Sequence, residues 1–198
     1  MLKLDYIHKT RRELQPIALE INLTEQLEIS RFRCACHLLN NVLKAATVNQ
    51  KYLPEFIKKL STFASSIRNS ISLSQMFSKA NCRPKTENTT RWFSQFMVLQ
   101  WAYRGNKKQL FGDLNCPVDL NQVEIYLQIL APAYDLNLIF QRSDSSICEV
   151  LPNILNLKLQ WSRMDVEDSH ASELLYFLTH FLMEKFKFEF ESPIYKVY

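Results

Sequence analysis

The scarcity of glycine is the feature of this sequence that most limits its fold. Gly105 and Gly112 are the two glycines among 198 residues, whereas an average usage of roughly 7% would give about 14. Phosphate-binding loops of the G-x-x-x-x-G-K-[ST] or G-x-G-x-x-G kind need more glycine than this, and so do the tight turns of antiparallel sheets. The sequence therefore disfavours nucleotide-binding enzymes of these classes and all-β folds.

Apolar residues recur with helical spacing along most of the chain, which favours a mainly α protein. The predicted helices cover residues 29–46, 56–71, 92–105, 119–142, 147–155 and 169–186. Asp119 or Asn121 is expected to cap the fourth of these helices, and Ser143 or Ser145 the fifth.

Two prolines and one polar run predict interruptions. Pro132 is expected to bend or split the helix over 119–142, and Pro152 to interrupt the next one. The run NCRPKTENTT, residues 81–90, has no apolar periodicity and predicts a loop of about ten residues, long enough to suspect a function.

Short strands are predicted at 1–7, 31–34 and 186–190, the last from alternating phenylalanines. The strand at 31–34 competes with the helix predicted from residue 29. Three scattered strands do not make a self-sufficient sheet unless the chain brings them together.

Charge is distributed very unevenly. Residues 34–108 contain 12 Lys/Arg and 2 Asp/Glu, whereas residues 109–198 contain 6 and 13. A basic segment of this kind is typical of nucleic-acid contact, because phosphates neutralised by lysine and arginine release counterions. The alternative is that the basic and acidic parts pack together, or that the lysines only lie on solvent-exposed helix faces and bind nothing.

The cysteines and the N-terminus predict an intracellular protein. Five cysteines at irregular spacing, with no signal-peptide pattern before them, indicate free thiols in a reducing compartment. The most apolar stretch, 174–183, is far shorter than the ~20 residues of a membrane span. No membrane association and no small-molecule substrate are expected.

Few residues suggest catalysis. Cys34, Cys36 and His37 are close in sequence, but a structural zinc site needs a second pair of ligands, which the isolated Cys82, Cys116 and Cys148 do not supply. The acidic run at 165–168 is better explained as the start of a helix.

Arg91 and Trp92 follow the polar loop directly. An exposed tryptophan beside an arginine can stack on an unpaired base, although a tryptophan packed under a helix is commoner.

Two motifs resemble a known family. The segment Cys34-Ala35-Cys36-His37-Leu38-Leu39-Asn40 resembles the C-x-x-H-x-L-N stretch of hAT-superfamily DNA transposases, and Thr90-Arg91-Trp92-Phe93-Ser94 resembles their T-R-W-x-S motif. More weakly, 130–132 with 150–154 resembles their helical insertion domain. The resemblance implies a partial RNase H-like α/β core over residues 1–50 and an all-helical insertion region over 51–198.

The resemblance also implies which residues have a role. Family members hold two Mg²⁺ ions with two aspartates and a glutamate, and Asp5 is the one candidate for these ligands, on a poor match. Cys34 and His37 would be packing residues near a vestigial pocket, and Trp92 would engage DNA. We therefore expect no nuclease or transposase activity and no bound cofactor or metal.

The expected function is that of a domesticated or fragmentary hAT-like protein in the nucleus, with weak, nonspecific DNA binding. The predicted DNA-binding residues are Lys58, Lys59, Arg83, Lys85, Arg91, Trp92, Arg104, Lys107 and Lys108. The alternatives are a module that binds a partner protein or a second copy of itself, and a partial gene product without a function of its own.

Overall fold

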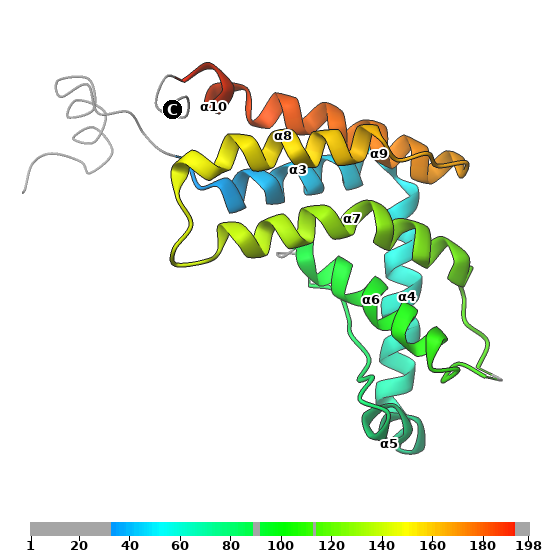
Figure 1. Cartoon of the computed structure of the whole chain (residues 1–198). Helices are drawn as coiled ribbons and strands as arrows, with labels where there is room; N and C mark the ends of the chain where they lie inside the picture. Colours follow the sequence, from blue (N-terminus) through cyan, green and yellow to red (C-terminus); the bar gives the residue numbers. More distant parts are fainter. Residues whose placement is uncertain (1–32, 89–91, 113, 193–198) are drawn as a thin grey trace, which may run out of the picture. The chain divides into compact units, whose positions relative to one another are not determined.

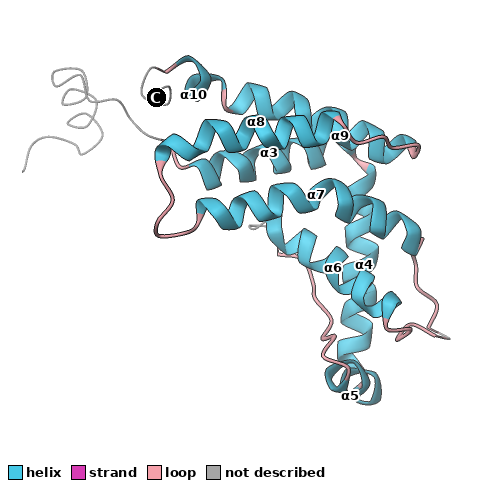
Figure 2. Ribbon diagram, in the orientation of Figure 1, coloured by secondary structure: helices cyan, strands magenta, loops and turns pink. Residues whose placement is uncertain are grey.

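The computed structural model describes residues 33–88, 92–112 and 114–192. All regular structure in these ranges is helical (Figure 2), which confirms a mainly α protein there. By its contacts the chain divides into the units Met1–Cys34 and Ala35–Tyr198. The first strand predicted, 1–7, lies outside the described residues, as do Asp5 and Arg91, whereas Arg33 and Cys34 are not in a strand.

The unit that begins at Ala35 is built from eight α-helices and one 3₁₀ helix within the described ranges. They are α3 (Ala35–Gln50), α4 (Tyr52–Asn69), α5 (Ile71–Lys79), α6 (Trp92–Lys107), α7 (Leu120–Phe140), η1 (Ile147–Glu149), α8 (Val150–Ser162), α9 (Ser169–Lys185) and α10 (Lys187–Glu191).

The helices of this unit form two groups joined by α4 and α6. Helices α3, α7, α8 and α9 pack along one another, with α3 against α9 and α8 against both α7 and α9 (Figure 1). Helix α4 leads away from this group and ends at α5. Helix α6 packs against both α4 and α7 and so connects the α5 end of the unit to the larger group.

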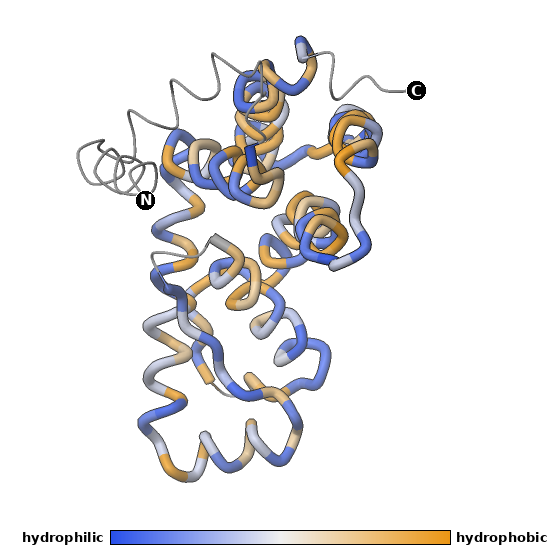
Figure 3. The backbone as a smooth tube through the Cα atoms, turned by 90° about the vertical axis from the view of Figure 1, so that its left-hand side faces the viewer, coloured by the Kyte–Doolittle hydropathy of each residue, from blue (hydrophilic) through white to orange (hydrophobic). Residues whose placement is uncertain are grey.

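The helices are amphipathic, and their apolar faces make one core (Figure 3). In α4 the buried residues follow three-four spacing, and they are Leu53, Phe56, Ile57, Leu60, Ala64 and Ile67. Each buried leucine, isoleucine or phenylalanine stabilises the fold by ~1.5–3 kcal/mol relative to the exposed side chain. The opposite face of α4 carries the exposed Lys58 and Lys59.

An aromatic cluster holds the α5 end together. The ring of Trp101 on α6 lies 6.1 Å from Phe77 of α5, 6.2 Å from Phe63 of α4 and 5.7 Å from Phe111. Gly105 makes room for Phe111, because a Cβ at Gly105 would lie 2.6 Å from Cζ of that ring. Helix α6 therefore continues through Gly105 to Lys107, two residues beyond its predicted end.

The helix caps are partly as predicted. Asp119 caps α7, where its carboxylate accepts from the N–H of Asn121 at 2.9 Å. The cap after α7 was predicted at Ser143 or Ser145 and is instead Ser146, which forms a capping box with Glu149. The box satisfies two N–H groups at once, an advantage that requires glutamate three residues after the serine.

Neither proline splits a helix, so the expected break at Pro132 and the expected interruption at Pro152 are wrong. Pro132 lies within α7, which is unbroken over 21 residues. A proline there removes one backbone hydrogen bond, and the remaining bonds and the buried face keep the helix whole. Pro152 is the third residue of α8, where the N–H it lacks would have no partner within the helix.

The strand predicted at 186–190 is wrong, because Lys187–Glu191 is the short helix α10. Phe186 and Phe190 are four residues apart, so three alternating phenylalanines also fit one turn of helix. Phe186 is buried, Phe190 is half-buried and Phe188 is exposed. Among the described residues, none of the helices combines the length and the apolar composition needed to cross a bilayer.

Candidate functional site

Hydrogen bonds define both ends of α5, including the turn that leads from α5 toward α6. Ser70 ends α4 and caps α5, accepting from the N–H of Leu73 at 3.5 Å. At the other end of α5, the N–H of Asn81 donates to the carbonyl of Ser78 and that of Cys82 to the carbonyl of Phe77. These two bonds form a Schellman motif, and they require the left-handed φ of 51° that Asn81 adopts.

Reciprocal hydrogen bonds tie this turn to α6. The indole Nε1 of Trp101 donates to the carbonyl of Cys82 at 3.2 Å, and the thiol of Cys82 lies 3.8 Å from the carbonyl of Trp101. Both side chains are buried. The segment that follows Cys82 therefore starts from a residue that hydrogen bonds hold against α6.

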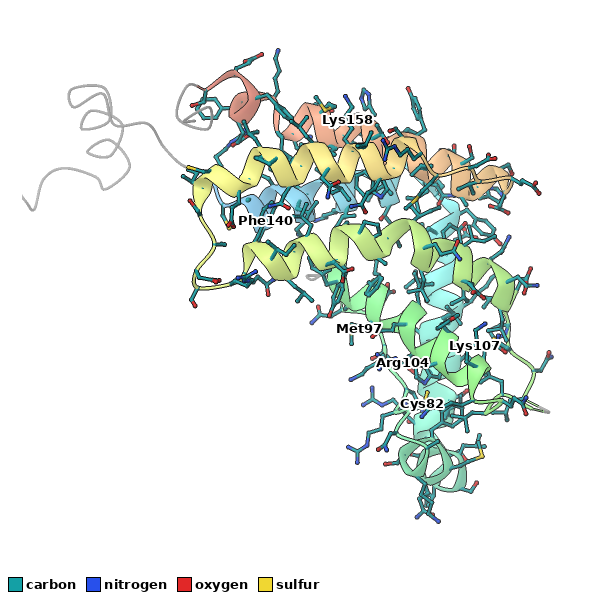
Figure 4. The ribbon with its side chains drawn as sticks, viewed as in Figure 1. Cys82, Met97, Arg104, Lys107, Phe140 and Lys158 are labelled. Atoms are coloured by element: carbon teal, nitrogen blue, oxygen red, sulfur yellow. The ribbon has the colours of Figure 1, made fainter. Side chains whose placement is uncertain are left out.

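A cavity of about 300 Å³ lies between this segment and α6. Figure 4 labels three of its lining residues, Cys82, Met97 and Arg104. We call this cavity the arginine pocket, and its lining residues are Ser78, Asn81, Cys82, Arg83, Lys85, Met97, Gln100, Trp101 and Arg104. Its charged groups are all cationic. Its neutral donors are a hydroxyl and two amides, and its apolar wall is made by Met97 and Trp101.

A second hollow, of about 560 Å³, adjoins the arginine pocket and shares Ser78, Arg83 and Lys85 with it. We call it the adjoining hollow, and its other lining residues are Arg68, Ser74, Gln75, Pro84 and Thr86. Arg68, in the last turn of α4, lies 3.4 Å from the hydroxyl of Thr86. The two hollows together carry four cationic side chains.

Among the residues that the structure describes, no carboxylate lines either hollow. Arg83 donates from Nε to the hydroxyl of Ser78 at 3.0 Å, and this bond positions the guanidinium. Its terminal nitrogens have no hydrogen-bond partner among the described residues. Within that part of the chain, Arg68, Lys85 and Arg104 likewise make no ion pair. The arrangement suits an anionic ligand.

Burial and two nearby cations affect the pKa of the Cys82 thiol. Burial raises the pKa of Cys82, while the nearby charges of Lys108 and Arg104 lower it by a smaller amount. The thiol therefore stays protonated at neutral pH. A buried, protonated thiol of this kind packs and donates, whereas the thiolate is the nucleophilic form.

The structure places the predicted DNA-binding residues in different surroundings. Arg83, Lys85 and Arg104 meet in the arginine pocket. Lys58 and Lys59 line another hollow, together with Glu55, Phe63, Asn115 and Pro117. The two sets are thus not parts of one cavity.

The lysines at the end of α6 have protein partners. Lys107 lies 3.5 Å from the carboxylate of Glu124 and 5.1 Å from the ring centre of Tyr103. Lys108 donates to the carbonyl of Ala80, the C-cap of α5. A cation at this position satisfies a free carbonyl and interacts favourably with the helix dipole.

The residues of the two family-like motifs have no shared site in the described chain. Trp92 begins α6, and Arg91 lies outside the described residues. Cys34 and His37 are exposed. Among the described residues no group of three or more His, Cys, Asp or Glu side chains is arranged to hold a metal ion.

Several residues of the site were not among those predicted. Arg68 belongs to α4, and Ser78 and Asn81 come from the end of α5. Gln100 precedes Arg104 by one turn of α6, a spacing that puts both on the same face. The sequence signal for Gln100 was this spacing, whereas Arg68 joins the site only through tertiary packing.

Comparison with family models gives no match, and a search of curated proteins gives none either. The class of ligand therefore has to follow from the chemistry of the two hollows.

Proposed function

We propose that this chain is a nucleic-acid-binding protein of hAT transposase-like origin that binds DNA without sequence specificity and does not cut it. The observation that supports binding is the convergence of Arg83, Lys85 and Arg104 on one pocket that contains no carboxylate. Arginine presents a fork of donors that matches phosphate oxygens. Arg68 extends the cationic lining into the adjoining hollow, as contact with a strand longer than one nucleotide requires.

The absence of sequence specificity follows from the kind of contact. Phosphate contacts fix the position of a protein on nucleic acid but do not read its bases. The site offers one α-helix, α6, but its pocket-lining residues are turned toward the loop after α5 rather than toward an open groove. We expect similar affinity for unrelated sequences of the same length.

Binding without cleavage is the form of this proposal that the site chemistry favours. Two-ion cleavage needs carboxylate ligands close to the bound phosphate, and the two hollows contain none. The hAT-like origin rests on the C-x-x-H and T-R-W-x-S resemblances, and a nuclear location follows from the proposed ligand. Sequencing the genomic DNA on both sides of the reading frame tests the origin, because it predicts coding or decayed sequence for other parts of the RNase H-like core.

A salt titration tests the proposed function. Affinity for a 20-nucleotide DNA, measured by fluorescence anisotropy, should fall steeply as salt rises, because each neutralised phosphate contributes about −0.7 to −0.9 to the slope of log K against log salt. Arg83→Gln with Lys85→Gln should reduce the steepness by about 1.5. Binding that is absent at low salt, or insensitive to salt, would contradict the proposal.

The matched control removes the same charge elsewhere. Lys158→Gln with Arg163→Gln changes two cations of α8 and its C-cap, far along the chain from the site, and should leave the slope unchanged. A third pair, Lys58→Gln with Lys59→Gln, asks whether the separate hollow on α4 also contacts DNA. An unchanged slope for this pair would remove Lys58 and Lys59 from the binding surface.

One observation favours a protein-interaction module as the second candidate. Leu155 and Leu159 lie one turn apart on α8 and are 51% and 45% exposed, a spacing that suits a second helix packed along the first. Light scattering separates the two functions. A monomer that binds DNA in a salt-dependent way supports the first, and an oligomer that Leu155→Glu dissociates and that ignores DNA supports the second.

A further inference from the structure

The arginine pocket carries more positive charge than one internal phosphate of a strand needs. A phosphodiester has a single negative charge, whereas a phosphate monoester carries about −1.5 to −2 at pH 7. Arg83, Lys85 and Arg104 bring three cations to one cavity. The match in charge is therefore better for a terminal phosphate than for a backbone phosphate.

The neutral donors of the pocket support the same choice. A monoester presents three terminal oxygens, each able to accept hydrogen bonds. Gln100 and Asn81 add amide donors to the cations, and the hydroxyl of Ser78 accepts from Arg83 while its own proton remains available to a ligand. Donors on several sides of one cavity suit an end group, which is free on all sides but one.

The dimensions and the walls suit more than a bare ion. A volume of about 300 Å³ is at the lower end for small-molecule sites, and it leaves room for the sugar that bears the phosphate. Met97 provides an apolar surface for that sugar. The chain that follows the sugar has a continuous cationic path, because the adjoining hollow shares Arg83 and Lys85 and adds Arg68.

The pocket is also formed before any ligand binds. The Schellman turn at Asn81 and the hydrogen bonds between Cys82 and Trp101 fix one wall, and the bond from Arg83 to Ser78 orients the guanidinium. Groups that are already ordered lose little conformational entropy on binding. A preformed cationic pocket selects its ligand by charge and shape.

We propose that the arginine pocket binds the terminal phosphate of a nucleic-acid strand, with the strand continuing into the adjoining hollow. This inference rests on the proposed nucleic-acid binding and goes beyond it, because nonspecific backbone contact does not distinguish a phosphorylated end from a hydroxyl end.

The test compares two single strands of the same 12-nucleotide sequence, labelled at the 3′ end and bearing either a 5′-phosphate or a 5′-hydroxyl. Anisotropy at pH 7.5 should give an affinity about tenfold higher for the phosphorylated strand, a factor that one charge-assisted hydrogen bond can supply. The ratio should shrink at pH 5.5, because the second pKa of the phosphate is about 6. Inorganic phosphate at millimolar concentration should compete and reduce the ratio.

Two variants assign the preference to the pocket. Arg104→Gln removes one of the three cations and should abolish most of the tenfold ratio. Arg163→Gln removes another exposed arginine, one that lies outside the pocket, and should preserve the ratio. Gln100→Trp narrows the cavity without changing the charge. It should abolish the preference for phosphate while the salt dependence of binding remains.

The outcomes separate this inference from the proposed function. Equal affinity for the two strands, with steep salt dependence intact, overturns the terminal-phosphate site and leaves nucleic-acid binding standing. Binding of neither strand overturns both. A tenfold ratio that Arg104→Gln and Gln100→Trp leave unchanged places the preference outside the arginine pocket and also overturns the inference.

Discussion

Tyr126 of α7 is almost fully buried, and its ring packs edge-on against Phe56 of α4 at 5.4 Å. Its hydroxyl has no hydrogen-bond partner in the part of the chain that the structure describes. Tyr52, on α4, provides a contrast, because its hydroxyl lies 2.9 Å from the side-chain oxygen of Gln122. The two tyrosines therefore differ in what their hydroxyl groups contribute.

Tyr126→Phe should raise the free energy of unfolding by about 1 kcal/mol, because it removes a buried polar group that has no partner. Tyr52→Phe is the matched control and should lower it by about 0.5–1.5 kcal/mol, since it breaks a hydrogen bond. Urea unfolding followed by circular dichroism measures both. A Tyr126→Phe variant that is less stable than the wild type would contradict the claim that the Tyr126 hydroxyl has no hydrogen-bond partner.

Stability should decline in alkali for the same physical reason. Burial raises the pKa of Tyr126 and of Cys82, so the folded state favours the protonated forms. Their contribution is complete below the ordinary values of 10.0 and 9.0 and is lost as pH rises toward the raised values. Urea midpoints of the wild type should fall above pH 9, and Tyr126→Phe should fall less.

At Gly105 the packing of a neighbouring ring, rather than the backbone conformation, requires glycine. An alanine there suits an α-helix better by up to about 1 kcal/mol, but its Cβ would lie 2.6 Å from the Phe111 ring. We expect Gly105→Ala to destabilise the protein by about 1–3 kcal/mol through overpacking. Phe111→Leu in the same chain should recover part of that loss, and additive effects in the double-mutant cycle would argue against the clash.

At the scale of the helices, the caps have the clearest energetic role. Asp168 precedes α9 and accepts from the N–H of Ala171 at 2.8 Å. Asp168→Ala should cost about 0.5–2 kcal/mol in thermal or urea unfolding. Asp165→Ala, an exposed aspartate in the same connection, should change stability by less than about 0.5 kcal/mol. Equal effects of the two changes would show that negative charge near the start of α9, rather than the capping hydrogen bond of Asp168, stabilises the helix.

The sequence predicted helices well where a cap and an apolar stripe agreed. Asp119 marks the start of α7, and the acidic run that ends in Asp168 marks the start of α9 as expected. Predictions from isolated patterns were less successful. Pro132 and the alternating phenylalanines at 186–190 each fit two structures locally, and the buried contacts of the folded chain decide between them.

The sequence indicates a cationic site, but it does not indicate which cationic residues share a cavity. The Lys/Arg-rich span 34–108 includes Arg83, Lys85 and Arg104, which line one cavity in the structure. Which cations share a cavity depends on how α4 packs against the segment after α5. For that reason Arg68 enters the site, whereas Lys58 and Lys59, ten and nine residues earlier on the same helix, line a different hollow.

At the scale of the whole unit, the cationic site and the acidic C-terminal part lie on different elements. The arginine pocket belongs to α5, α6 and the segment between them, while 13 of the 20 Asp/Glu follow residue 108. On the proposed function, the field of this distribution would draw a polyanion toward the cationic part of the molecule and away from the acidic part. DNA should therefore bind in one preferred place.

Site-directed cross-linking checks this placement. A photoactivatable group on Gln75→Cys, beside the adjoining hollow, should cross-link to bound DNA, and the same group on Gln160→Cys of α8 should not. The exposed Cys34 and Cys148 are replaced by serine in both proteins. Comparable cross-linking at the two positions would mean that bound DNA has no preferred location.

Helix α5 has a single buried side chain, that of Phe77, although it provides one wall of each hollow. Ile71 of the same helix is 79% exposed. A helix that buries so little opens more readily than helices that bury a whole face, such as α3 and α9. Its amide hydrogens should therefore take up deuterium earlier than those of α3 and α9, and a bound strand should slow the uptake at α5 before it changes the uptake of α3 or α9.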